Sequence, residues 1–458
     1  MDKQDKHIKD MTTGTPYKLL LQFAVPLLVG NIFQQLYNMA DSIIVGNFVS
    51  ANALGAIGTT NSLQFFFFSL VGGLSVGIGI IVSQYFGAGE NDKVKDAIGN
   101  AIWIIMICAA MMACVGFFLA RPILILLDTS VVILEDAVNY LKVTSIGLLC
   151  MGLYNGVSSI LRALGDSKTP LFFLIIASII NVILDFVFVL GFGWGVVGAG
   201  VATAFSQFIS AITCILYAYK SNTYFRLKLS NIKLQSAIVK KCCRLGIPVA
   251  LQNALIAFSL VVLQKIVNGY GAEFTTSFTV VSRIESLVQQ PFMSLGAALS
   301  TYTGQNIGAG NKKRVVKGFN SATLMSSIFA VIIIVIFWSF TPLIVSIFGK
   351  NDVVRDIAVD GLRITCCFYV FLGLIYTTRN VLNGAGDAMF SLFTGIVECI
   401  GRVGFAYPLT LIPFMGRYGV FYATGLTWFL NGMFSLIRYK MGKWKKIKVI
   451  DSEKNSEE

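Results

Sequence analysis

The chain has 458 residues, of which 55% are hydrophobic and only 13% are charged, and its mean hydropathy is +0.74. A soluble domain carries about 25% charged residues, so this composition excludes a soluble protein and predicts a polytopic membrane protein. The 36 Lys and Arg residues outnumber the 23 Asp and Glu residues, which gives a net charge of +13. In a membrane protein this excess is typical of basic cytoplasmic loops that face anionic lipid, so we expect no nucleic-acid partner.

Residues that carry catalytic or metal chemistry are scarce and scattered. The only His, His7, lies in the polar N-terminal tail, and the nine Cys residues show no metal-ligand spacing and no Cys-x-x-Cys pair. These patterns exclude a His-based metal site and a His-centred catalytic triad. No nucleophile–base set and no Lys-Ser/Thr phosphate loop is present. We therefore expect no enzyme, no metal and no cofactor.

Twelve apolar segments of about 20 residues or more follow one another, each long enough to cross a bilayer as an α-helix. They predict an all-α polytopic membrane protein with 12 transmembrane helices. The first 20 residues mix charged and polar side chains, so we expect no cleavable signal peptide. In chain order the segments are 18–46, 55–84, 97–120, 131–157, 171–191, 196–219, 244–267, 275–303, 318–341, 354–380, 391–412 and 418–440.

The two halves of the chain repeat each other at a constant spacing. Motifs of the first half recur 221 residues later, and such constancy over separated motifs is difficult to obtain by chance. The recurring pairs are Gln84 with Gln305, Gly87-Ala88-Gly89 with Gly308-Ala309-Gly310, Asp166 with Asp387, and Thr203 with Thr424.

Each repeat contains six helices, and an even number gives both copies the same orientation in the membrane. We predict two six-helix bundles around a central cleft, an architecture typical of alternating-access transporters. Basic residues concentrate in both tails and in the link between the halves, which places both termini in the cytoplasm. The predicted regions are an N-terminal tail at 1–17, a first lobe at 18–219, a linker at 220–243, a second lobe at 244–440 and a C-terminal tail at 441–458.

The first segment carries a polar stripe. Asn31, Gln34, Asn38 and Asp41 are three or four residues apart, so they share an arc of roughly 80° on one helix face. A carboxylate inside an apolar helix costs about 2.5 kcal/mol or more, which favours a cavity in which Asp41 binds a cation or a proton. The alternative is that Asp41 lies near the end of its helix and reaches water.

Asn181 and Asp185 form a second polar pair, four residues apart in a wholly apolar stretch. Two carboxylates from different helices of one bundle can share a proton or hold Na⁺, and desolvation with mutual repulsion favours proton uptake. The site therefore suits either a proton or Na⁺ at Asp41, Asn181 and Asp185. The alternative is a polar cluster that only packs helices together.

The second half does not repeat these acids, so the fold itself does not require them. Glu398 and Arg402 are its buried charges, and Glu before Arg at a spacing of four favours an ion pair within one helix. A role in gating is the alternative for this pair. The positions that correspond to Asp41, Asn181 and Asp185 are Leu263, Arg402 and Ala406.

Three local patterns complete the chain. Pro26 lies inside the first segment, where it leaves a carbonyl unpaired and provides a point at which the helix can bend during gating. The run from Phe65 to Phe68 favours a lipid-facing or core-facing position over contact with a substrate. The two Gly-Ala-Gly motifs are typical of tight turns that end helices.

These residues together resemble the multidrug and toxic compound extrusion (MATE) family over residues 15–440. The resemblance depends on Pro26, on Ala40-Asp41-Ser42 with Val45-Gly46, on the paired Gln and Gly-Ala-Gly motifs, on Arg162-Ala163-Leu164-Gly165-Asp166, and on Asn181 with Asp185.

The resemblance implies a V-shaped pair of six-helix lobes that exports cationic or amphipathic drugs by H⁺ or Na⁺ antiport. It implies a cation site at Asp41, Asn181, Asp185 and Thr203, and a substrate-facing surface that includes Gln34, Tyr37 and Asn155, to which the polar stripe adds Asn38. Another branch of the family carries a Glu in helix seven. Here the nearby polar residue is Gln252, which moves the expected site to the first lobe.

We therefore expect a monomeric multidrug efflux antiporter of the inner cell membrane, in contact with lipid and with small-molecule drugs. One alternative is a flippase for a lipid-linked sugar, which favours a strongly cationic cleft for a pyrophosphate. Another is a passive pore, whose transport would ignore pH and Na⁺ gradients. The sequence leaves H⁺ and Na⁺ both open as the coupling ion.

Overall fold

The computed structural model describes residues 8–348 and 351–450, and within them it forms helices and turns with no strand. This confirms the all-α prediction. The helices of the first half are α1 (Pro16–Phe48), α2 (Ala51–Ala88), α3 (Asn91–Phe118), α4 (Ala120–Leu126), α5 (Val131–Ala163), α6 (Lys168–Asp185) and α7 (Gly195–Ser221). Those of the second half are α8 (Ser236–Asn268), α9 (Ala272–Gly308), α10 (Lys312–Ser346), α11 (Asp352–Cys366), α12 (Tyr369–Gly384), α13 (Ala388–Thr410) and α14 (Gly419–Lys440).

Twelve spans account for all of these helices except α4, which has seven residues. Ten helices in the described part of the chain are long and apolar enough to cross a membrane, and α11 with α12 forms an eleventh span bent by 51°. The twelfth is α9, which has 37 residues and whose many polar side chains lower its hydropathy. We call α1–α7 the first lobe and α8–α14 the second lobe.

The sequence repeat is also a structural repeat. Gly165 and Gly386 occupy corresponding corners and have φ angles of +89° and +94°. Gly89 and Gly310 follow α2 and α9 with φ angles of +79° and +75°. Backbone at positive φ strains any residue with a Cβ, so the glycines of each motif allow the same turn in each lobe.

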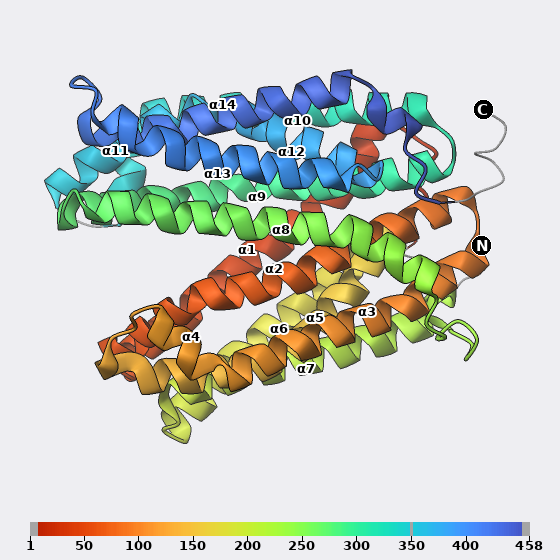
Figure 1. Cartoon of the computed structure of the whole chain (residues 1–458), viewed down its shortest axis with the longest axis horizontal. Helices are drawn as coiled ribbons and strands as arrows, with labels where there is room; N and C mark the ends of the chain where they lie inside the picture. Colours follow the sequence, from red (N-terminus) through yellow and green to blue (C-terminus); the bar gives the residue numbers. More distant parts are fainter. Residues whose placement is uncertain (1–7, 349–350, 451–458) are drawn as a thin grey trace.

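The two lobes converge at the end of the molecule that carries both termini, on the right in Figure 1, and they diverge toward the other end. We call the converging end the closed end. There the first turns of each lobe pack into the other lobe. Leu20 and Phe23 of α1 lie in a core with Ala298 and Tyr302 of α9, and Ile238 of α8 lies in a core of α2 and α3 residues.

A reciprocal pair of hydrogen bonds joins the lobes at the closed end. The Gln84 Nε2 donates to the Gly384 carbonyl, and the Gln305 Nε2 donates to the Ala163 carbonyl, both at 2.9 Å. We call these two bonds the glutamine clamp. Since the partners are repeat equivalents, the clamp has the two-fold pseudosymmetry of the chain.

Both terminal segments lie across this closed end. The Met11 amide donates to Gln305 Oε1 at 2.8 Å, and Met11 is fully buried. The Lys9 amide donates to the Leu164 carbonyl of the first lobe at 3.3 Å. At the other terminus Ile450 is 2% exposed and packs in the core that contains Ile160. The termini therefore bridge the two lobes.

The link between the lobes runs from 222 to 235, contains one short 3₁₀ helix (Thr223–Phe225) and follows the surface of α3. The Trp103 Nε1 donates to the Ile232 carbonyl at 2.8 Å, and the Asn231 Nδ2 donates to Asp96 Oδ1 at 2.6 Å. Helix α8 begins at Ser236, eight residues before its apolar segment, because its first turns are amphipathic and pack Ile238 and Cys242 against the first lobe.

Candidate functional site

The first lobe contains a cavity of about 460 Å³. Its walls come from α1, α2, α5 and α7, and one side chain of α9 reaches it from the second lobe. Polar, aromatic and thioether side chains are mixed in its lining. The described lining residues include Gln34, Gln35, Tyr37, Asn38, Met39, Asn61, Gln64, Phe65, Phe67, Phe68, Tyr140, Thr144, Met151, Thr203, Gln207 and Arg283.

Three of the four residues expected to face substrate lie on this wall. Gln34, Tyr37 and Asn38 line the cavity from successive turns of α1. Asn155 is not among the described lining residues, and its Nδ2 donates to the Met151 carbonyl of its own helix at 2.7 Å. The polar face of α1 thus borders a cavity.

A buried polar group lies behind the cavity wall. Asn181 is 1% exposed and Asp185 is fully buried, both on α6. The Asn181 Nδ2 donates to Thr203 Oγ1 of α7 at 3.4 Å. Thr203 itself lines the cavity. A hydrogen bond thus joins Asn181 to Thr203, and Asp185 lies one helical turn after Asn181 on α6. We call these three residues the first-lobe polar trio.

Asp185 lies where the helix changes its hydrogen-bonding pattern. Helix α6 ends at Asp185, and a π-helical segment from Phe186 to Gly191 continues the span. Such segments are rare in proteins, and those that occur are often found at functional sites, because they shift the backbone out of the ordinary α-helical register. The carboxylate is therefore held at a break in α6, inside the apolar part of the lobe.

Asp41 belongs to α1, but its side chain lies outside the described residues. The neighbouring Asn38 and Met39 both line the cavity. Its role in a cation site stays a prediction. In the second lobe the corresponding Leu263 and Ala406 are 2% and 0% exposed and belong to one apolar core, so the second lobe has no acid pair at these positions.

Pro26 lies inside α1, which continues without interruption from Pro16 to Phe48. Because proline has no amide hydrogen, the Gln22 carbonyl has no partner at the usual helical spacing. The helix retains a point at which bending costs less than elsewhere.

The cavity is also lined by residues that the sequence analysis did not assign to it. Phe65, Phe67 and Phe68 line it, so three of the four Phe residues expected to face lipid or core contribute to its wall. Arg283 reaches it from α9. Helical spacing assigns residues to a face, but it does not reveal which face borders a cavity, and no signal in the sequence places Arg283 opposite the first lobe.

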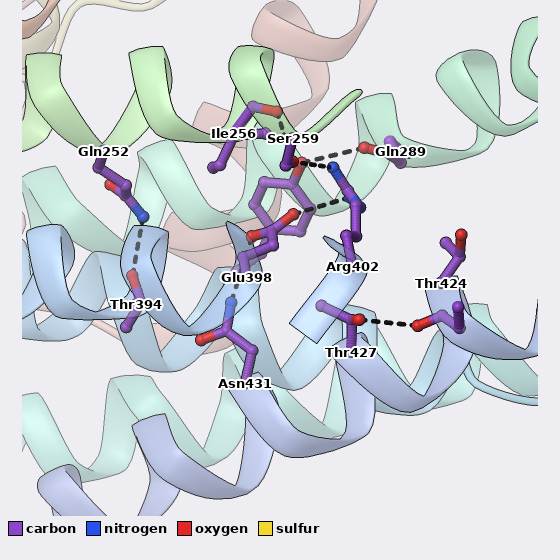
Figure 2. A network of polar contacts seen from close by, with 12 residues as sticks. Gln252, Ile256, Ser259, Gln289, Thr394, Glu398, Arg402, Thr424, Thr427 and Asn431 are labelled. Carbon is purple, nitrogen blue, oxygen red and sulfur yellow. Dashed lines mark hydrogen bonds and ion pairs between the residues drawn. The ribbon is translucent and has the colours of Figure 1, made fainter. Parts of the chain in front are cut away.

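The second lobe has its own buried polar group, shown in Figure 2. Arg402 Nη2 and Glu398 Oε1 form an ion pair of 2.8 Å on α13, and Figure 2 shows these side chains pointing toward each other. Arg402 Nη1 donates to Ser259 Oγ of α8, and Asn431 Nδ2 of α14 donates to Glu398 Oε2, both at 3.2 Å. The expected ion pair is thus present, and it connects α8, α13 and α14.

Gln252 lies beside this group rather than in a cation site. Its Nε2 donates to Thr394 Oγ1 at 2.9 Å, and the residue is 2% exposed. Figure 2 shows both side chains between α8 and α13. The neutral amide therefore joins two helices through a hydrogen bond.

The described residues contain no group of three or more His, Cys, Asp or Glu side chains that would hold a metal ion. The first-lobe polar trio offers a carboxylate, an amide and a hydroxyl. Carboxylate, carbonyl and hydroxyl oxygens suit hard cations, and a buried carboxylate suits a proton. Chemically, the trio can take up either.

The family model MatE matches residues 26–187 and 248–407, one stretch in each lobe. The "Probable multidrug resistance protein YpnP" of Bacillus subtilis is 29% identical over 96% of this chain and 98% of its own length. The "Probable multidrug resistance protein NorM" of Thermotoga maritima is 24% identical over 96% of both chains.

A solved structure described as the outward-facing conformation of a multidrug resistance MATE family transporter has the same fold. Its TM-score is 0.89 at 22% identity, with 97% of this chain and all of that chain covered. Since the family model matches both lobes and more than half of the sequence, the resemblance of the motifs is confirmed, and the chain belongs to the MatE (multidrug and toxic compound extrusion) family.

Proposed function

We propose that this protein is a multidrug efflux antiporter that exports cationic or amphipathic compounds in exchange for H⁺ or Na⁺. The relatives YpnP and NorM carry multidrug-resistance names, which supports a drug as the cargo. The mixed lining of the first-lobe cavity supports the same class, because aromatic and Met side chains repack around varied apolar shapes.

One observation carries the coupling. Thr203 belongs both to the cavity wall and, through Asn181, to the buried polar trio. A ligand in the cavity and an ion on the trio therefore share a side chain. Binding of the drug changes the position of the Thr203 side chain for the ion, and binding of the ion changes it for the drug. Exchange requires such a coupling between the two sites.

The cycle follows from this arrangement. Asp185, with Asp41 as its proposed partner, takes up the ion when the cavity faces the outside, and the drug leaves. Helix α1 shifts at Pro26 as the acids are neutralised. The lobes then reorient, the ion is released to the cytoplasm, and the cavity accepts the next drug. Both termini are cytoplasmic in this proposal.

The test uses everted membrane vesicles and a cationic fluorescent dye, with pH and Na⁺ gradients imposed separately. Wild-type protein should accumulate the dye under one of the two gradients, which identifies the coupling ion. Asp41→Asn and Asp185→Asn should abolish this accumulation at normal expression. Asp360→Asn, which neutralises an exposed carboxylate on α11, is the matched control and should behave as wild type.

Full gradient-driven accumulation in Asp185→Asn would remove the coupling role. Transport that ignores both gradients would indicate a passive pore. A lipid-linked sugar as cargo is less well supported, because Arg283 is the one charged residue among the described lining of the large cavity, whereas a pyrophosphate calls for several cations.

A further inference from the structure

A second, smaller cavity lies between the lobes, directly beside the glutamine clamp. It has a volume of about 170 Å³, and its lining includes Ala163, whose carbonyl accepts the clamp bond from Gln305. Side chains of α1, α2 and α5 face it from the first lobe, and side chains of α9 and α12 face it from the second. We call it the clamp cavity.

The clamp cavity is lined by a cation that has no partner among the described residues. Arg162, in the last turn of α5, lines it. Within residues 8–348 and 351–450, no carboxylate lies within ion-pair distance of this guanidinium, and no hydrogen-bond acceptor is recorded for it. No Asp or Glu is among the described lining residues. Nearby Asp166 instead accepts bonds from the Lys168 and Thr169 amides at the start of α6.

Two amides, Asn31 and Asn380, line the cavity and donate to Ser294 Oγ and to the Tyr376 carbonyl. Apart from Arg162, the other polar side chains of the lining are hydroxyls, which can donate hydrogen bonds. The hydroxyls of Ser83, Ser159 and Ser294 already donate to main-chain carbonyls at 2.7–2.8 Å. Those of Ser300 and Thr301, both on α9, have no partner in the described part of the chain. A guanidinium and two unused hydroxyl donors without a competing carboxylate match the needs of an oxyanion.

The fold itself does not require Arg162. Its repeat equivalent is Asn383, one residue before the end of α12, where the same corner is formed. Asn383 is 4% exposed and accepts a hydrogen bond from Ser391. A cation at a helix C-terminus is weakly favourable, but α12 ends in the same way without one. Capping of α5 therefore does not explain an arginine that faces a cavity.

We propose that the clamp cavity is an oxyanion-binding site in which Arg162, Ser300 and Thr301 hold a phosphate or carboxylate group between the lobes. The site goes beyond the proposed drug export and does not depend on it. Because one lobe supplies the cation and the other supplies the hydroxyls, a bound oxyanion joins the lobes and stabilises the closed end. Two sources share this chemistry, free inorganic phosphate and the carboxylate of a transported molecule.

The first experiment measures the thermal unfolding of the purified full-length protein in detergent. It is titrated with sodium phosphate against sodium chloride at equal ionic strength. We expect a saturable, phosphate-specific rise of roughly 1–3 °C in the wild type. Arg162→Gln should abolish the rise, Thr301→Val should weaken it, and Arg162→Lys should retain part of it. Arg244→Gln removes an exposed arginine and should respond as wild type.

The second experiment identifies the source. Two rhodamines that differ only in a free carboxylate or its methyl ester are compared in vesicle transport. If Arg162→Gln loses transport of the free acid at least tenfold more than of the ester, the oxyanion belongs to the substrate. If the ratio of free-acid to ester transport is unchanged, while phosphate still stabilises only the proteins that carry Arg or Lys at position 162, the ligand is a free anion.

Two results together overturn the proposal. Phosphate stabilises wild type and Arg162→Gln equally, or stabilises neither protein, and Arg162→Gln changes the transport of both rhodamines by the same factor. Arg162 is then a solvated cation. A protein that transports no dye but shows the Arg162-dependent phosphate shift would contradict the export proposal and leave the oxyanion site intact, so the two proposals fail separately.

Discussion

Thr203 is the residue at which the two parts of the candidate site meet, and its hydroxyl is the group to remove. Thr203→Val keeps the shape and deletes the oxygen that accepts from Asn181. A hydrogen bond of this kind contributes about 0.5–1.5 kcal/mol, so we expect gradient-driven dye transport to fall roughly tenfold. The measurement is the initial uptake rate in everted vesicles.

Thr203→Ser is the matched control, since it restores the hydroxyl and should recover most of the rate. Because the side chain also borders the cavity, dye affinity is measured separately by fluorescence titration. Equal rates for Thr203→Val and wild type would show that this oxygen does not connect the cavity to the ion site.

Arg283 should set the charge preference of the first-lobe cavity. It is the one charged side chain among the described lining residues, and it comes from the second lobe. An exposed guanidinium repels a cationic ligand at close range. We expect Arg283→Gln to raise the transport of a cationic dye relative to a neutral dye by about threefold, and Arg283→Lys to leave the ratio unchanged. Competition between the two dyes in one vesicle preparation measures the ratio.

Single residues were predictable where the pattern itself is unusual. Asn181 and Asp185 stand out because polar residues are costly in an apolar helix, and the stripe of Gln34 and Asn38 on α1 borders the cavity. The predicted positions of Asn155 and Phe65 differ from the structure for a physical reason. The amide of Asn155 donates its hydrogen bond within its own helix, and a Phe is equally compatible with core, lipid and cavity. Side-chain identity alone does not separate these environments.

At the scale of helices, Glu398 and Arg402 should act as one unit that connects α13 to α8 and α14. Removing one partner of a buried pair leaves an uncompensated charge and costs about 3–5 kcal/mol. We therefore expect Arg402→Met to lower the unfolding temperature more than the double substitution Glu398→Gln with Arg402→Met. Thermal unfolding in detergent of the wild type, of Glu398→Gln and Arg402→Met alone, and of the double variant gives the four values that a double-mutant cycle needs.

Strictly additive effects of the two substitutions would contradict this coupling. If the double variant is stable but transports no dye, the pair has a gating role as well as a structural one. Glu273→Gln with Arg417→Met is a useful comparison. Glu273 is exposed in the first turn of α9, Arg417 is half-buried in the 3₁₀ helix that precedes α14, and the two form no ion pair with each other among the described residues.

The helices themselves were largely predictable because each apolar run is as long as a bilayer is thick. The exceptions have local causes. Helix α9 is rich in polar side chains, so its length identifies it better than its hydropathy. The span at 354–380 is divided into α11 and α12 by a 51° bend. Helix α8 extends beyond its apolar segment because its first turns are amphipathic and pack on the first lobe.

At the scale of the whole molecule, the repeat predicted two similar lobes but not how they meet. The Gly-Ala-Gly motifs were expected only to end helices. In the structure a Cβ on Gly87 would lie 1.9 Å from the Gln305 carbonyl oxygen, and a Cβ on Gly308 would lie 1.9 Å from that of Gln84. The motif therefore lets α2 and α9 cross in close contact. This contact joins the two lobes, so it could not be predicted from the sequence of either half alone.

This crossing makes a prediction about which conformation the protein prefers. Gly87→Ala and Gly308→Ala each insert a methyl group against main-chain atoms of the other lobe, and 1.9 Å is far inside any real contact. The lobes must separate at the closed end to accommodate it. Because the two glycines are repeat equivalents on opposite lobes, we expect the same effect from either substitution, namely a shift toward states in which the closed end is open.

Thiol labelling measures this shift. A single cysteine at Ala163, which is 2% exposed and lines the clamp cavity, is placed in a cysteine-free background and reacted with a maleimide in detergent. Labelling should be at least several-fold faster with either glycine substitution than without. Gly404→Ala is the control, since nothing lies within 4 Å of the added methyl group there. Faster labelling with only one of the two glycine variants would show that the lobes do not meet symmetrically, and unchanged labelling with both would mean that the crossing does not keep the closed end shut.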